Sequence, residues 1–181
     1  TKVFFNESLL IDIDPQSARV LGKSKNDTLY LDVLRTLSKE VATELATFEG
    51  SSIRLMGLTS LDKEVIKGFS DFNGRIYIDT NLLTDIDKET AKILSQFQIE
   101  TLELNGLKSI NKDVAEALST FGGKYLSLNG LTTIDKDVAE RLSQFEGEEL
   151  FLEGLTSIKK EVIVALSQFQ GTKSLKFKKN N

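Results

Sequence analysis

The chain alternates between two hydrophobic patterns, and this alternation recurs along its whole length. Each unit begins with a short segment in which every second residue is apolar, such as "LEL" at 102–104. A period of two over a few residues predicts a short strand with one buried face. Further along the unit, apolar residues recur at the spacing of a helix with one buried side, as at Val138, Ala139, Leu142 and Phe145. Each unit therefore predicts one strand followed by one helix.

The units are copies of one another. Their strand segments open 23 to 26 residues apart, at Val3, Leu29, Ile53, Ile76, Leu102, Leu126, Leu150 and Leu175. This spacing predicts seven full repeats and a C-terminal strand, which together make residues 1–181 a single domain. Because the chain begins at Thr1 without Met or a signal sequence, we expect it to be part of a longer chain.

Helix boundaries are also marked in the sequence. A side chain that can accept a hydrogen bond precedes most helical segments, and such a side chain caps the first turn of a helix. The predicted caps are Asp14, Ser38, Asp62, Asp87, Asn111 and Asp135, whereas Lys159 occupies the equivalent place in the last repeat. A column of phenylalanines closes the apolar face of six helical segments and is expected to stack in the core: Phe48, Phe72, Phe97, Phe121, Phe145 and Phe169.

One such unit cannot bury its own apolar stripe, whereas a stack of units can. Equivalent strands then become parallel neighbours, and the helices stack on the other side. We therefore predict an α/β fold: a right-handed solenoid, shaped as a horseshoe or arc, with a parallel sheet on the concave face and helices on the convex face. The predicted strands span residues 29–31, 53–55, 76–78, 102–104, 126–128, 150–152 and 175–177.

The segment "YLSLNGLTTI" at 125–134 and its copies resemble leucine-rich repeats, and the resemblance covers the whole chain. With Leu126 and Leu128 as the paired leucines, the usual asparagine position holds Leu131, so no asparagine ladder is expected. The short bacterial surface-antigen repeats are the more similar subclass. Leu131, Ile134, Val138, Ala139, Leu142 and Phe145 fall on the positions of their pattern, with Leu142 in its Cys column and Phe145 in its last Leu column. The resemblance implies protein binding or adhesion at a bacterial cell surface, and with it an extracellular or surface location.

Composition removes several classes of function. The net charge of −4 gives no general attraction to nucleic acid. No apolar run approaches the ~18 residues needed for insertion into a membrane. The chain lacks His and Cys, which removes the commonest general base and the commonest metal ligands. We therefore expect a protein that is not an enzyme and that uses no cofactor and no metal.

The candidate functional residues point out of the predicted sheet on its concave face. All three tyrosines of the chain lie in these outward columns, together with two arginines, and both residue types are enriched at binding hot spots. The predicted partner-binding residues are Tyr30, Asp32, Arg54, Arg75, Tyr77, Asp79, Tyr125 and Phe151. Strand propensity alone would also place aromatic residues there, which is the structural alternative. The expected partner is a protein or peptide, with carbohydrate as an alternative because aromatic rings stack on sugars.

A second hypothesis is that the chain is a structural spacer or adhesin that assembles through its edges. Lys176, Lys178 and Lys179 would protect the last strand from edge pairing, whereas no comparable feature precedes the first strand. Self-association through the N-terminal edge is therefore an open alternative. Two repeats carry two extra residues after the strand, at 6–9 and 79–82, and such insertions map to loops on one rim.

Overall fold

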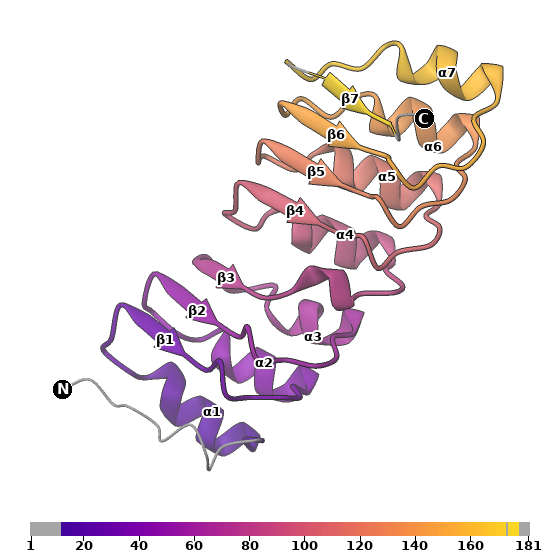
Figure 1. Ribbon diagram of the computed structural model, residues 1–181. Helices are drawn as coiled ribbons and strands as arrows, with labels where there is room; N and C mark the ends of the chain where they lie inside the picture. Colours follow the sequence, from indigo (N-terminus) through magenta and orange to yellow (C-terminus); the bar gives the residue numbers. More distant parts are fainter. Residues whose placement is uncertain (1–11, 173, 178–181) are drawn as a thin grey trace.

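The computed structural model describes residues 12–172 and 174–177, and over this range helices and strands alternate along the chain (Figure 1). The helices are α1 (Pro15–Gly22), α2 (Lys39–Leu45), α3 (Lys63–Gly68), α4 (Lys88–Ser95), α5 (Lys112–Ser119), α6 (Lys136–Leu142) and α7 (Lys160–Leu166). The strands are β1 (Thr28–Tyr30), β2 (Ser52–Arg54), β3 (Arg75–Tyr77), β4 (Thr101–Glu103), β5 (Tyr125–Ser127), β6 (Glu149–Phe151) and β7 (Ser174–Lys176). A short 3-10 helix, η1 (Thr80–Leu82), follows β3. The chain is thus an α/β protein built from repeats.

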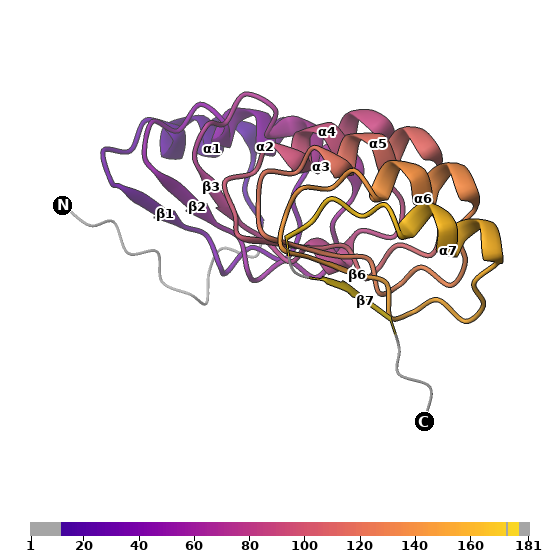
Figure 2. The same cartoon turned by 90° about the horizontal axis from the view of Figure 1, so that it is seen from above.

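The strands run parallel and in sequence order, as predicted, and each begins one residue earlier than expected. The pairing is regular; Leu29 lies beside Ile53, and Leu126 lies beside Leu150. The strands follow one another along one side of the molecule, and the helices follow one another along the other (Figures 1 and 2). The predicted first strand at Val3 and the insertion at 6–9 lie outside the described residues.

The prediction of one continuous sheet is wrong. The strands form a three-stranded sheet, β1-β2-β3, and a four-stranded sheet, β4-β5-β6-β7. Consecutive strands pair throughout except at β3 and β4, which lie on either side of the break. The helix layer continues past this point, since α4 follows α3 along the same side (Figure 1). The break therefore affects the strand side of the molecule.

Each helix begins where the sequence predicts. Asp14 caps α1 by accepting from Ser17 N, and Asp135 caps α6 by accepting from Val138 N. The other predicted caps act in the same way: Ser38, Asp62, Asp87 and Asn111. Lys159 precedes α7 without a side-chain cap, which confirms it as the exception.

The core lies between the strands and the helices, and its repeating units are leucine and phenylalanine columns. Leu102, Leu104 and Leu107 of one repeat are fully buried, as their equivalents are in the next. Phe145 is fully buried, and its ring centroid lies 6.3 Å from that of Phe121 and 6.4 Å from that of Phe169. The predicted phenylalanine column therefore stacks from repeat to repeat in this part of the chain.

A ladder of Asp and Asn side chains also joins the repeats, and the prediction that no such ladder exists needs correction. Asn81 Oδ1 accepts from Asn105 N at 3.0 Å, Asn105 Oδ1 from Asn129 N at 2.9 Å, and Asn129 Oδ1 from Glu153 N at 2.8 Å. Asp32 Oδ1 does the same for Met56 N at 2.9 Å. Asp32, Asn105 and Asn129 directly follow the second buried leucine of their strand segments, whereas Asn81 lies three residues after Ile78, within η1. The ladder was missed because it was sought at the column of Leu131.

Charged groups tie α3 to α4 on the helix side of the break. Lys67 Nζ lies 2.7 Å from Asp87 Oδ2, 3.0 Å from Glu64 Oε1 and 3.3 Å from Glu89 Oε2, and the lysine side chain is only 14% exposed. Asp87 also accepts hydrogen bonds from Thr90 N and Oγ1 as the cap of α4. The bond from Lys67, aided by those from Thr90, holds the pKa of Asp87 well below its ordinary value of 3.8.

Because the pKa of Asp87 is lowered in the folded state, its ionised form stabilises the fold above pH ~4, and this contribution is lost as the pH falls through the folded pKa. We expect Asp87→Asn, which keeps a capping oxygen, to lower the free energy of unfolding at pH 7. The difference from the wild type is expected to shrink as the pH falls below ~4. Urea unfolding measured from pH 7 to pH 2 checks this. A difference that stays constant down to pH 2 would contradict it. Asp135→Asn is the matched control, because no ion pair of Asp135 is seen in the described chain.

Candidate binding surface

The strands expose one face that no helix covers (Figure 2). Within a strand the middle residue is buried toward the helices, and the flanking residues point the other way, as Arg75 and Tyr77 do around Ile76. We call the outward side of the strands the open face. The predicted site residues that lie on described strands, from Tyr30 to Phe151, belong to this face.

An aromatic cluster occupies the open face of the first sheet. The register places Arg54 beside Tyr30 on one strand and beside Tyr77 on the other. The Arg54 guanidinium carbon lies 5.9 Å from the centroid of the Tyr30 ring and 5.8 Å from that of Tyr77. Arg54 Nε also donates to Asp32 Oδ2 at 3.1 Å. The aromatic cluster is defined as Tyr30, Asp32, Arg54 and Tyr77, and all four are among the partner-binding residues predicted from the sequence.

The cluster keeps large apolar surfaces in contact with solvent. Tyr30 is 66% exposed and Tyr77 is 39% exposed, and Met56 between them in sequence is 49% exposed. Cation–π contacts of this kind contribute ~0.5–1 kcal/mol at exposed positions, and the Asp32 bond fixes the guanidinium between the rings. The side chains are therefore held in place before any partner arrives. Met56 lies in an outward column, but its residue type did not single it out.

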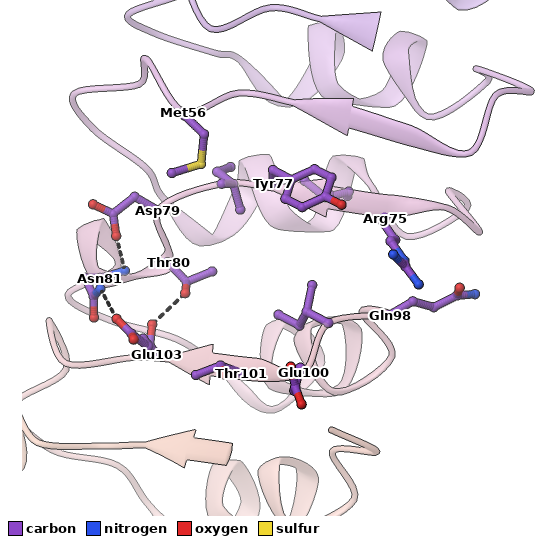
Figure 3. A pocket seen from close by; sticks show the side chains of 13 residues that line it. Met56, Arg75, Tyr77, Asp79, Thr80, Asn81, Gln98, Glu100, Thr101 and Glu103 are labelled. Atoms are coloured by element: carbon purple, nitrogen blue, oxygen red, sulfur yellow. Dashed lines mark hydrogen bonds between the residues drawn. The ribbon is translucent and has the colours of Figure 1, made fainter. Parts of the chain in front are cut away.

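A cleft of about 720 Å³ opens where the two sheets part. Figure 3 shows its lining from β3 and from β4. Arg75, Tyr77 and Asp79 come from one wall, and Gln98, Glu100, Thr101 and Glu103 come from the other. Asp79 and Glu103 lie toward η1, whereas Arg75 and Gln98 lie toward the opposite end (Figure 3). Three predicted site residues thus line a cleft that the sequence did not predict.

One end of the cleft is held open by Ile99. The equivalent position in the next repeat is Gly123, where an added Cβ would lie 2.6 Å from the carbonyl oxygen of Ile99. This close approach lets Lys124 N donate to Glu100 O at 2.8 Å, and the next repeat makes the same bond from Glu148 N to Lys124 O at 2.7 Å. At Ile99 the side chain prevents such an approach. Its repeat is joined to the preceding loop instead by Gln98 Nε2, which donates to Asn73 O at 3.1 Å.

The insertion at 79–82 shapes the other end. The inserted residues begin η1, and Thr80 Oγ1 donates to the backbone oxygen of Glu103. Asn81 N donates to Asp79 Oδ1 at 3.0 Å, and Asn81 Nδ2 donates to Glu103 Oε2 at 3.1 Å. Met56 has no side-chain oxygen to continue the ladder, and Asn81, whose Oδ1 accepts from Asn105 N, resumes it in the next repeat. The insertion is a bridge between the two sheets.

Tyr125 and Phe151 lie elsewhere, on the second sheet. Tyr125 is the first residue of β5, and its hydroxyl donates to Glu148 Oε2 at 3.0 Å. Phe151 ends β6 and lies between Ser127 and Lys176 in the register. The structure therefore brings six of the eight predicted residues together around β1, β2 and β3, and leaves these two apart.

Five residues that line the cleft are not among the predicted site residues: Thr80, Asn81, Ile99, Thr101 and Glu103. Two departures from the repeat pattern could have indicated them: the inserted residues after β3, and Ile99 at a loop position that is glycine in other repeats. In the described ranges, no group of His, Cys, Asp and Glu side chains is arranged to hold a metal ion. A search of the same residues found no helix with the length and apolarity to cross a membrane.

The sequence matches no protein-family model, and no curated protein matches it. What this surface does must therefore be inferred from its own residues.

Proposed function

We propose that this chain is a non-enzymatic binding module that holds a protein or peptide on the open face of its strands. In this proposal residues 1–181 form a single leucine-rich-repeat domain, a right-handed solenoid with the open face on its concave side. The asparagine ladder supports the resemblance to leucine-rich repeats, because each ladder residue serves the next repeat in turn. A location at a bacterial cell surface follows from the resemblance alone.

The observation that carries the proposal is the aromatic cluster. Two exposed tyrosine rings flank one guanidinium, and a carboxylate holds that guanidinium in position. Tyr and Arg are the residue types that dominate binding hot spots, because they bring large contact area together with hydrogen-bonding groups. A pre-ordered cluster also loses little side-chain freedom on binding, which preserves affinity. Fold maintenance does not require the rings of Tyr30 and Tyr77, since both are exposed and face away from the core.

We expect the double substitution Tyr30→Ala and Tyr77→Ala to weaken partner binding at least tenfold, or ~1.4 kcal/mol. The protein is expected to remain folded, because both rings are exposed and their replacement opens no cavity. The test immobilises the chain, captures partners from the extracellular and surface fractions of the source cells, and measures the affinity of each captured protein. Thermal unfolding of the same double variant checks the fold.

Tyr125→Ala combined with Phe151→Ala is the matched control. It removes two outward aromatic residues from the second sheet and leaves the aromatic cluster intact. We expect this control to bind as the wild type does. Equal affinity for the wild type and the cluster variant would remove the cluster as the site and favour the spacer role.

A further inference from the structure

We propose that the cleft between β3 and β4 receives an extended peptide segment, which pairs with both strands and joins the two sheets. The segment carries a lysine or arginine that lies beside Asp79 and Glu103. This inference rests on the proposed function, since it names the class of partner and the manner of its docking. It has its own test, because Tyr77 belongs to both sites but Tyr30 lies outside the cleft and Thr101 lies outside the aromatic cluster.

The unpaired backbone groups of β3 point toward the cleft. In a parallel strand, successive N–H groups alternate between the two edges. Arg75 N donates to Ser51 O, and Tyr77 O accepts from Leu55 N, so these groups face β2. The N–H groups of Ile76 and Ile78 therefore face the other way. Neither is seen to donate to another described residue.

The same alternation applies to β4. Tyr125 N donates to Glu100 O, and Leu104 N donates to Ser127 O, so these groups face β5. The N–H groups of Thr101 and Glu103 consequently face the cleft, and neither has a partner among residues 12–172. The cleft thus lies between two strand edges with free donors, which is the arrangement that strand addition uses.

The two edges are kept from pairing with each other. Ile99 prevents the loop approach at one end, and the η1 bridge through Thr80 spans the gap at the other. Neighbouring strands lie ~4.8 Å apart, so one inserted strand would need edges separated by about twice that spacing. The cleft volume of about 720 Å³ falls within the ~300–1,000 Å³ of ligand-binding clefts.

Charge indicates what the segment carries. Asp79 and Glu103 make no ion pair with any described cation, and both bond to Asn81, which keeps them together. Glu100 differs, because its Oε1 lies 2.6 Å from Lys124 Nζ. A cationic side chain on the open side of an inserted strand would meet two carboxylates that lack such a partner.

The alternation of side chains along a strand predicts which residue types the peptide carries on each of its two faces. Residues on an inserted strand would point in turn toward the open face and toward the helices. The helix side of the cleft offers Ile78 and Ile99, which are only partly buried. The open side offers Tyr77, Asp79 and Glu103. The preferred segment therefore alternates apolar residues with polar residues, at least one of which is Lys or Arg.

The probe is a phage-displayed library of random nonapeptides, selected on the wild-type chain. Thr101→Pro is the cleft variant, because it removes one cleft-facing N–H and leaves the β5-facing groups of β4 in place. Thr101→Val is its matched control, because it keeps the N–H. We expect selection of alternating apolar and basic peptides that bind the Pro variant at least tenfold more weakly and the Val variant equally well. Urea unfolding of both variants confirms that they are folded.

A test on the peptide needs no protein variant. N-methylation of alternate backbone amides in a selected peptide removes the hydrogen bonds along one of its edges, and we expect at least tenfold weaker binding. Asp79→Asn with Glu103→Gln keeps the acceptors of the Asn81 bonds but removes both charges, and we expect at least threefold weaker binding. No enrichment over the Pro variant, or selected peptides that tolerate N-methylation at every position, would overturn the proposal.

Tyr30→Ala separates this inference from the proposed function, since Tyr30 does not line the cleft. We expect Tyr30→Ala to leave nonapeptide binding unchanged. If nonapeptides bind Tyr30→Ala normally and the double variant Tyr30→Ala, Tyr77→Ala still binds captured proteins normally, the cleft proposal stands and the aromatic cluster is rejected as the site. If the double variant binds captured proteins more weakly and no nonapeptide is selected, the aromatic cluster stands and the cleft proposal is rejected.

Discussion

Replacing Phe145 by alanine is expected to lower the free energy of unfolding by about 3–5 kcal/mol. The ring is fully buried and stacks between Phe121 and Phe169, so its removal opens a cavity bordered by two other repeats. Neighbouring repeats stabilise one another through such contacts, and the loss therefore extends beyond one unit. Urea unfolding followed by circular dichroism measures the change.

Phe169→Ala is the control for this result. Phe169 belongs to the same column but is only partly buried and has one aromatic neighbour in the described residues. Its replacement is expected to cost clearly less than that of Phe145, whereas Phe121→Ala, which removes another buried ring of the stack, should resemble Phe145→Ala. A loss below ~1 kcal/mol at Phe145 would be incompatible with a cavity in a packed core.

The second large effect concerns Gly123, where alanine is expected to cost about 1–3 kcal/mol. An added Cβ would lie 2.2 Å from the Phe121 ring and 2.6 Å from the backbone oxygen of Ile99. The ring is buried and the oxygen belongs to the backbone, so neither can move away without disturbing the stack. We expect the bond from Lys124 N to Glu100 O to weaken, because it depends on the same close approach. Urea unfolding and amide hydrogen exchange at Lys124 measure the two effects.

Gly122→Ala is a control one residue away. A Cβ at Gly122 meets no atom within 4 Å, so its effect on the free energy of unfolding is expected to stay within ~0.5 kcal/mol. Equal costs at the two positions would mean that backbone flexibility, and not the approach of neighbouring loops, decides the outcome. The explanation given for the break at Ile99 would then fail as well.

Local rules explain why much of the fold was predictable. The helix starts depend on one side chain and the amides that follow it, so Asp14 and Asp135 could be placed without knowing the rest of the structure. The strands follow from alternation, and repetition of the same alternation predicts parallel neighbours. The one-residue shift of each strand is within the ordinary uncertainty of element ends.

The break between β3 and β4 was not predictable in the same way. It depends on what a side chain at position 99 meets in the preceding repeat, and a pattern within one repeat does not contain that information. The ladder was missed for a related reason, because the leucine-rich-repeat pattern was aligned with its asparagine position at Leu131 and not at Asn129. Hydrogen bonds from one repeat to the next depend on the relative position of both repeats, which the sequence of one repeat does not contain.

The candidate surface also has one part that could be predicted from the sequence and another part that depends on contacts between repeats. Tyr30, Arg54 and Tyr77 could be grouped from sequence, because equivalent positions on consecutive parallel strands must lie side by side. The stacking of Arg54 between the rings and its bond to Asp32 depend on rotamers that the sequence does not specify. The cleft depends on two local exceptions to the repeat, Ile99 and the insertion that forms η1.

The ladder has a consequence for how such a gene can change. Asn105 and Asn129 each bond to the next repeat in the same way, and Leu102 and Leu126 open two units of similar sequence 24 residues apart. Removing or copying one such unit by unequal recombination would join surfaces that already fit each other. Alleles that differ by whole units of this length are therefore expected to fold, and their variation should be concentrated after Ile99, where the repeats are most uniform.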